Sequence, residues 1–126
     1  MVGQKAFVAD IFERFAPDPA SIRAARLLVL ASLGPLDDAE VAQLLTTELS
    51  ANVVHHAKTP FSVAITHDDQ GMLTVEVHDH DPTLPVVAPY DPAAPRGRGL
   101  LLVEALSRDW GVTSVPEDGK TVWFRL

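Results

Sequence analysis

The sequence predicts an α+β protein in which helices lie on one face of a mixed, mostly antiparallel sheet. Two segments, 20–33 and 39–57, contain no glycine or proline, which predicts two long helices. Apolar residues occupy alternate positions after residue 60 and again after residue 110, which is typical of strands joined in hairpins. Because 47 % of the 126 residues are hydrophobic, the chain can close one core, and we expect a single domain over residues 1–126.

The N-terminal part is expected to contain one strand and the two long helices. Evenly spaced apolar residues over 7–15 predict the strand. Asp18 followed by Pro19 is typical of a helix N-cap and first turn, and a glycine-proline pair ends the helix that follows. Asp37 and Glu40 have the spacing of a capping box, so we expect them to begin the second helix.

The C-terminal part is expected to form two hairpins, separated by a loop and a short helix. Apolar residues alternate over 61–65 and 73–77, on either side of a turn at 68–71. Residues 79–96 contain prolines at 82, 85, 89, 92 and 95, which disfavour a helix or a central strand and predict a long loop. The remaining predicted elements are a helix over 100–106 and strands over 110–115 and 121–126.

The composition excludes several classes of function. A formal net charge of −7 opposes binding to a phosphate backbone, so we expect no direct contact with nucleic acid. The sequence contains no cysteine, which removes disulfides and thiolate metal sites. No apolar run approaches the roughly 18 residues that a membrane helix needs, and the first residues do not resemble a signal peptide. We therefore expect a cytoplasmic protein that does not bind membranes.

Two polar residues interrupt the apolar stripe of the long second helix. Val41, Leu45, Glu48 and Asn52 follow spacings of four, three and four, so all lie on one face. A carboxylate buried without a partner costs several kcal/mol, so Glu48 must meet a cation, a hydrogen-bond donor or a solvent-filled pocket. From the helix alone, a stripe that ends in solvent is favoured over a functional site as the explanation of both residues.

The long loop supplies a second indication of a ligand site. It begins with Asp79 and Asp81 at the end of a strand and closes with Gly97-Arg98-Gly99 at the start of a helix. Glycines let the backbone approach a phosphate, and the N–H groups at a helix N-terminus favour an anion. The sequence contains neither a P-loop nor a dinucleotide-binding glycine fingerprint. Taken alone, the two glycines are better explained by a tight entry into the helix.

Three segments, in this order, resemble the motifs of the GHKL (Bergerat-fold) ATPases. Residues 48–57, ELSANVVHHA, resemble the N-box; residues 76–85, EVHDHDPTLP, resemble the G1 region; and residues 97–103, GRGLLLV, resemble the G2 region. The closing strands are similar to those of short actinobacterial members related to anti-sigma-factor serine kinases. The resemblance covers nearly the whole chain and implies a two-layer sandwich of the Bergerat type.

The resemblance implies a role for each of the unusual residues. Asn52 would hold Mg²⁺ at the phosphates of ATP, and Glu48 would be the catalytic base. Asp79 would accept a hydrogen bond from the adenine amino group, with support from Thr121 through water. Residues 86–96 would form the ATP lid. The other residues expected beside the nucleotide are His55, Leu84, Pro85, Gly97, Arg98, Gly99 and Leu100.

The G1 region departs from the family pattern. A fuller motif carries two glycines after the aspartate, whereas this chain has Asp79-His80-Asp81-Pro82. Neither glycine is present, and Asp81 adds a negative charge near the nucleotide. The aspartate expected to read adenine is retained.

The histidines do not suggest a metal site. His55 and His56 are adjacent on a helix and point about 100° apart, so they cannot readily bind one ion. His56 falls on the apolar stripe and is expected in the core, while His55 is expected nearer the pocket. His67, His78 and His80 are interpreted as scattered, solvated side chains.

The leading hypothesis is an ATP-dependent serine/threonine protein kinase. The resemblance implies that it binds a sigma factor, phosphorylates an anti-sigma-factor antagonist and forms a homodimer. The alternative is a nucleotide-binding or degenerate module that acts by sequestering a protein partner. A third hypothesis, hydrolysis of ATP to water, ranks last because the chain carries no domain that would use such a cycle.

Overall fold

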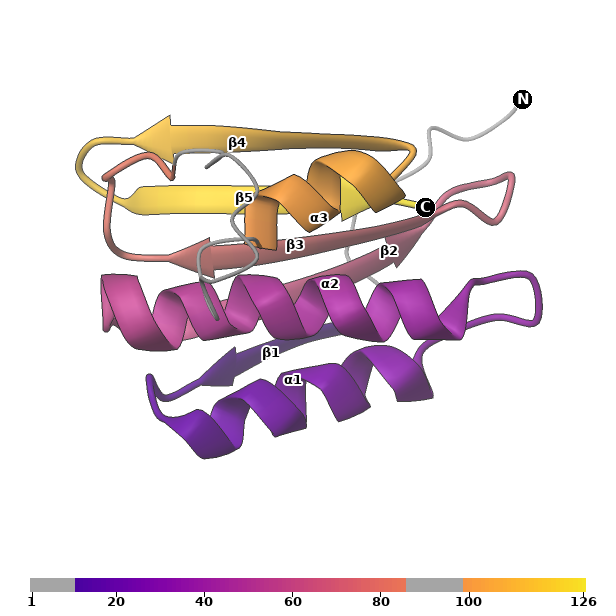
Figure 1. Cartoon of the computed structure of the whole chain (residues 1–126), viewed down its shortest axis with the longest axis horizontal. Helices are drawn as coiled ribbons and strands as arrows, with labels where there is room; N and C mark the ends of the chain where they lie inside the picture. The colour runs from indigo at the N-terminus through magenta and orange to yellow at the C-terminus, as the bar shows by residue number, and fades with distance from the viewer. Residues whose placement is uncertain (1–10, 86–98) are drawn as a thin grey trace, which may run out of the picture.

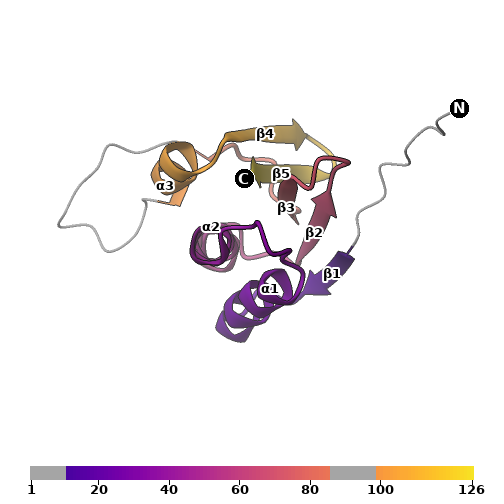
Figure 2. The same cartoon turned by 90° about the vertical axis from the view of Figure 1, so that its right-hand side faces the viewer.

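The computed structural model describes residues 11–85 and 99–126, which form two layers (Figures 1 and 2). One layer is a five-stranded sheet in the order β1-β2-β3-β5-β4, and the helices cover one of its faces. The strands are β1 (Ile11–Phe15), β2 (Phe61–His67), β3 (Leu73–Asp79), β4 (Asp109–Val115) and β5 (Gly119–Arg125). The helices are α1 (Pro19–Ala31), α2 (Ala39–Asn52) and α3 (Gly99–Leu106), and a π-helical turn, η1 (Val53–Ala57), extends α2.

The predicted α+β class and its two layers are confirmed. The predicted helices and hairpins are all present in the described residues, with shifts of a few residues at their ends. The sheet differs in one detail, because all four pairings among the described strands are antiparallel rather than mixed. Residues 7–10 of the predicted first strand and residues 86–96 of the predicted lid lie outside the described residues.

The start of α2 differs from the predicted capping box. The N-cap is Asp38, whose side chain accepts a hydrogen bond from the N–H of Val41 at 3.1 Å. Asp37 instead accepts from the N–H of Gly34 at 2.6 Å and lies 2.9 Å from Nε2 of His67. The prediction was wrong because Asp37 turns back to the preceding loop and to β2, contacts that local spacing does not reveal.

The register of β3 against β5 determines which side chains meet beneath the helices. Val75 pairs with Phe124 and Val77 with Val122, and all four side chains are buried. Since alternate residues of a strand face the same side, the next pair along this face consists of Asp79 and Lys120. The apolar core therefore ends in two buried charged residues, at the end of the sheet where β3 stops.

The end of α2 is also irregular. The N–H of Lys58 donates to the carbonyl oxygen of Val53 at 2.7 Å, which closes a five-residue π-helical turn. Lys58 then adopts a left-handed conformation with φ 57°, which ends the helix. Single π-helical turns of this kind are common at functional sites. The predicted helix thus extends to residue 57 as expected, but its last turn is wider than an α-helix.

Candidate functional site

A cavity of about 280 Å³ opens between the end of α2, the ends of β3 and β5, and the start of α3. Its walls are mostly aliphatic, with a few polar side chains, which is typical of small-molecule sites. The described lining residues are Leu49, Asn52, Val53, His56, Ala57, Val77, Asp79, Asp81, Thr83, Leu84, Pro85, Gly99, Leu100, Lys120 and Val122.

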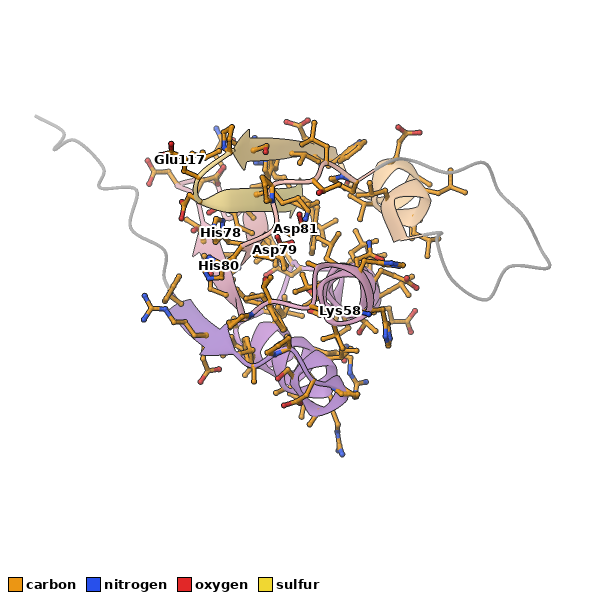
Figure 3. All side chains as sticks on the ribbon, turned by 90° about the vertical axis from the view of Figure 1, so that its left-hand side faces the viewer. Lys58, His78, Asp79, His80, Asp81 and Glu117 are labelled. Carbon is orange, nitrogen blue, oxygen red and sulfur yellow. The ribbon has the colours of Figure 1, made fainter. Side chains whose placement is uncertain are left out.

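The floor of the cavity is a buried ion pair. Asp79 and Lys120 are only 3 % and 8 % exposed. The ammonium of Lys120 lies 3.1 Å from Oδ1 and 3.0 Å from Oδ2 of Asp79, and it donates to the carbonyl oxygen of Asp81 at 2.9 Å. Figure 3 views this end of the molecule, with Asp79 and Asp81 directed toward the α2 side of the sheet. Each buried charge is therefore compensated by the other.

The segment after β3 is held in place by two short turns. The N–H of Asp81 donates to Oδ1 of Asp79 at 2.8 Å, and the N–H of Thr83 donates to Oδ1 of Asp81 at 2.9 Å. The hydrogen bonds from the backbone and side chain of Thr83, assisted by the charge of Lys120, lower the pKa of Asp81. Because its pKa lies below the ordinary value, Asp81 stays ionised at neutral pH and adds a negative charge to the rim.

The start of α3 lies directly against α2. A Cβ atom at position 99 would be 2.9 Å from Nδ2 of Asn52 and 3.4 Å from Cβ of Glu48, so only glycine fits this contact without displacement. The first N–H groups of a helix have no partner within the helix and favour an anion. The close contact therefore brings these donors beside the two polar residues that interrupt the stripe of α2.

We expect Gly99→Ala to displace the side chain of Asn52 and to change the free energy of unfolding by only about 0.5 kcal/mol, because the atom in the way is the end of a flexible side chain beside the cavity. Urea unfolding measures the stability change, and the NMR signals of the Asn52 side-chain amide report the displacement. Gly34→Ala is the matched control, because the nearest described atom to a Cβ there is Oδ2 of Asp37, at an ordinary 3.5 Å. An Asn52 amide that does not move in Gly99→Ala would contradict the predicted contact.

Six of the residues expected at the site line the cavity: Asn52, Asp79, Leu84, Pro85, Gly99 and Leu100. Glu48 is not among the lining residues, but its Cβ lies close to the start of α3. Gly97 and Arg98 lie outside the described residues, as does the lid at 86–96. The cavity thus gathers residues from each of the three motif-like segments.

The two adjacent histidines take opposite places from those expected. His56 lines the cavity and is exposed, whereas His55 is not among the lining residues. The helical stripe itself was assigned correctly, since Leu49 and Val53 on the same face also line the cavity. The prediction for His56 was wrong because a cavity lies beside this last turn, so the stripe there faces the cavity rather than the closed core.

Thr121 does not reach the cavity. It pairs with His78 across β3 and β5, and its Oγ1 lies 2.9 Å from Nδ1 of His78. Strand alternation places both on the face opposite Asp79. The β5 residues that face the cavity are Lys120 and Val122, on either side of Thr121. Thr121 therefore cannot support an adenine contact in this cavity, contrary to the prediction.

Lys120 lines the cavity and was not among the residues expected there. Lys120, Val122 and Phe124 are alternate residues of β5, and all three are buried. The sequence could have indicated this position, because alternate residues of a strand share one face and Lys120 alternates with the apolar Val122 and Phe124. Its pairing with Asp79, 41 residues away, requires the register of the sheet.

The helices over one face of an antiparallel sheet, and the cavity between an asparagine, a buried aspartate and a helix N-terminus, are consistent with an ATPase domain of the GHKL class. The family model described as "Histidine kinase-like ATPase domain" matches residues 15–126, and the chain belongs to this family. A comparison with curated proteins found no match. None of the helices in the described residues is long and apolar enough to cross a membrane.

Proposed function

We propose that the protein binds ATP with Mg²⁺ in this cavity and acts as an anti-sigma-factor serine/threonine protein kinase. The observation that carries the proposal is the convergence of Asn52, Asp79 and the start of α3 on one cavity in a member of the histidine kinase-like ATPase family. Adenine and the phosphates need different environments, and the cavity offers an aliphatic wall, the carboxylate of Asp79 and the backbone N–H groups at the start of α3.

The base-binding end is supported by the aliphatic lining and by Asp79. Leu49, Val77 and Val122 contribute flat apolar surface on which an adenine ring can lie. A carboxylate offers about four acceptor positions. Three are used, by the N–H of Asp81 and by two contacts with Lys120, so Asp79 keeps capacity for an amino donor. This supports selection of adenine over guanine, which presents an acceptor at that ring position.

The phosphate end is supported by Asn52 and the start of α3. The side-chain oxygen of Asn52 is a ligand of the kind Mg²⁺ prefers, and the residue lies against Gly99 in the cavity lining. The N–H groups of Gly99 and Leu100 would hold phosphate oxygens. Mg²⁺, when bound with the nucleotide, neutralises charge that develops during phosphoryl transfer.

Glu48 is proposed as the base that orients or deprotonates a serine hydroxyl of a partner protein. It lies one turn before Asn52 on α2, beside the start of α3. We further propose that the kinase binds a sigma factor, phosphorylates an anti-sigma-factor antagonist in the cytoplasm and acts as a homodimer. These partners rest on the resemblance of the three motifs.

A second function is favoured by the Lys120–Asp79 ion pair. Lys120 already provides Asp79 with donors, and the G1 segment lacks the glycines that let the backbone approach a nucleotide. Because Lys120 already neutralises the carboxylate of Asp79, the domain can stay folded without ATP. Such a domain would regulate by sequestering a protein partner, with nucleotide bound weakly or not at all.

Calorimetric titration of ATP and GTP, each with Mg²⁺, tests the proposal. We expect the wild type to bind ATP and not GTP, and Asn52→Ala to weaken ATP binding at least tenfold, or about 1.4 kcal/mol. Gln43→Ala is the matched control, since this amide lies on α2 and donates to the carbonyl oxygen of Ala39 of the same helix. Absence of ATP binding at about 1 mM nucleotide would instead favour the sequestering module.

A further inference from the structure

Two histidines and an aspartate form a cluster on the side of the sheet away from the cavity. His78 belongs to β3, His80 follows β3, and Asp118 lies in the turn between β4 and β5. One ligand atom from each of the three lies within 4.8 Å of the other two. Figure 3 shows His78 and His80 beside each other, directed away from α2. The interpretation of these histidines as scattered side chains was therefore wrong.

The sheet itself brings the cluster together. His78 and His80 are two residues apart and share one side of the chain, and their rings contact edge to face with centroids 5.6 Å apart. Asp118 joins them because the turn before β5 lies tightly on the end of β3. A Cβ on Gly119 would overlap the carbonyl oxygen of Asp79 and lie 2.6 Å from Cα of His80, so only glycine permits this approach.

Neighbouring groups already orient the two histidines. Nδ1 of His78 lies 2.9 Å from Oγ1 of Thr121, which leaves Nε2 for a ligand. The backbone N–H of His80 donates to Oγ1 of Thr59 at 3.0 Å, which holds the segment that follows β3. A histidine that binds a metal through one nitrogen is commonly fixed by a hydrogen bond at the other, so Thr121 has the place of such an orienting partner.

We propose that His78, His80 and Asp118 form a binding site for a divalent transition metal of the zinc type. Two imidazoles and one carboxylate are a donor set that Zn²⁺ prefers, and Zn²⁺ accepts water as its fourth ligand. Tetrahedral zinc with bonds of about 2.1 Å needs ligand atoms roughly 3.4 Å apart. His80 and Asp118 are exposed, so rotation of these two side chains can bring the ligand atoms from within 4.8 Å of one another to the separation that zinc needs.

This site differs in chemistry from the proposed nucleotide site. Mg²⁺ prefers oxygen ligands, whereas imidazole nitrogens favour Zn²⁺ and other transition metals. His78 and Asp79 are consecutive residues that face opposite sides of the sheet. The two sites therefore use different residues and can be tested independently.

Titration of ZnCl₂ into the nucleotide-free protein, followed by calorimetry, tests the proposal. We expect one Zn²⁺ per chain, and at least a tenfold loss of affinity in His80→Ala and in Asp118→Asn. Thr121→Val, which removes the orienting bond but no ligand, is expected to lose about 10- to 100-fold. Glu117→Gln is the matched control, because it neutralises the neighbouring exposed carboxylate of the same turn and should bind zinc like the wild type.

NMR of the histidine rings provides a readout that does not depend on the heat of binding. In the wild type, Zn²⁺ should shift the ring nitrogens of His78 and His80 and leave those of His55 unchanged. Failure of zinc to bind up to about 1 mM would overturn the proposal. So would equal binding by the wild type, His80→Ala and Glu117→Gln, because a non-specific surface site would then explain the metal. Circular dichroism of each variant establishes that it is folded.

Discussion

Asp79→Ala is expected to abolish ATP binding and to lower the free energy of unfolding by about 3–5 kcal/mol. The two effects have separate causes. Removal of the carboxylate takes away the acceptor for the adenine amino group, and it also leaves the ammonium of Lys120 buried without its counter-charge. Removing one partner of a buried pair costs far more than replacing both, because the ammonium of Lys120 then keeps, among the described residues, only the carbonyl oxygen and the charge of Asp81 as partners.

The double variant Asp79→Ala with Lys120→Met separates the two effects. Since it removes both charges, we expect it to recover most of the stability in urea unfolding while ATP binding stays abolished in calorimetry. In the single variant Lys120→Met the carboxylate of Asp79 is still present, and it still accepts a hydrogen bond from the N–H of Asp81. Adenine-selective binding by the stable double variant would show that Asp79 serves only to compensate Lys120 and does not read the base.

Glu48→Gln is expected to reduce phosphoryl transfer by about 10²- to 10⁴-fold, the usual contribution of a positioned base, while ATP binding is retained. The amide keeps the size of the side chain next to Gly99 but cannot accept the serine proton. Transfer of γ-labelled phosphate to proteins that co-purify with the chain from its native cell measures the rate. Calorimetry on the same samples measures ATP affinity.

Glu40→Gln is the matched control for the catalytic variant. Glu40 is an exposed carboxylate in the first turn of the same helix, far along α2 from the cavity. We expect it to transfer phosphate at the wild-type rate. If Glu48→Gln also transferred at that rate, the proposed base would be wrong. A wild type that binds ATP but labels no co-purifying protein would favour the sequestering module over the kinase.

Much of the fold could be predicted because it depends on local patterns. The alternation over Leu73, Val75 and Val77 extends to Asp79, so the sequence contained the information that this aspartate faces the core side of β3. Helical spacing likewise placed Glu48 and Asn52 on one stripe of α2. In both cases the period of the backbone determines the direction of the side chain, whatever lies opposite.

Local patterns were insufficient where the neighbouring element decides the environment. His56 was placed on the correct stripe, but only the packing of α2 against β3, β5 and α3 decides that this turn faces a cavity. Asp37 had the spacing of a capping residue, yet His67 of β2 and Gly34 bind it instead. Thr121 was carried over from a resemblance of segments, although strand alternation turns it away from the cavity.

The sequence by itself determined the α+β class, the order of helices and strands, and the three segments whose polar residues mark a GHKL domain. Only the tertiary structure decided what those residues meet. The β3–β5 register pairs Asp79 with Lys120, and Gly99 allows α3 to lie on Asn52. The same register, with Gly119, brings His78 and His80 to Asp118. Periodicity specifies the direction of a side chain, whereas its partner depends on strand register and helix contacts between residues far apart in the chain.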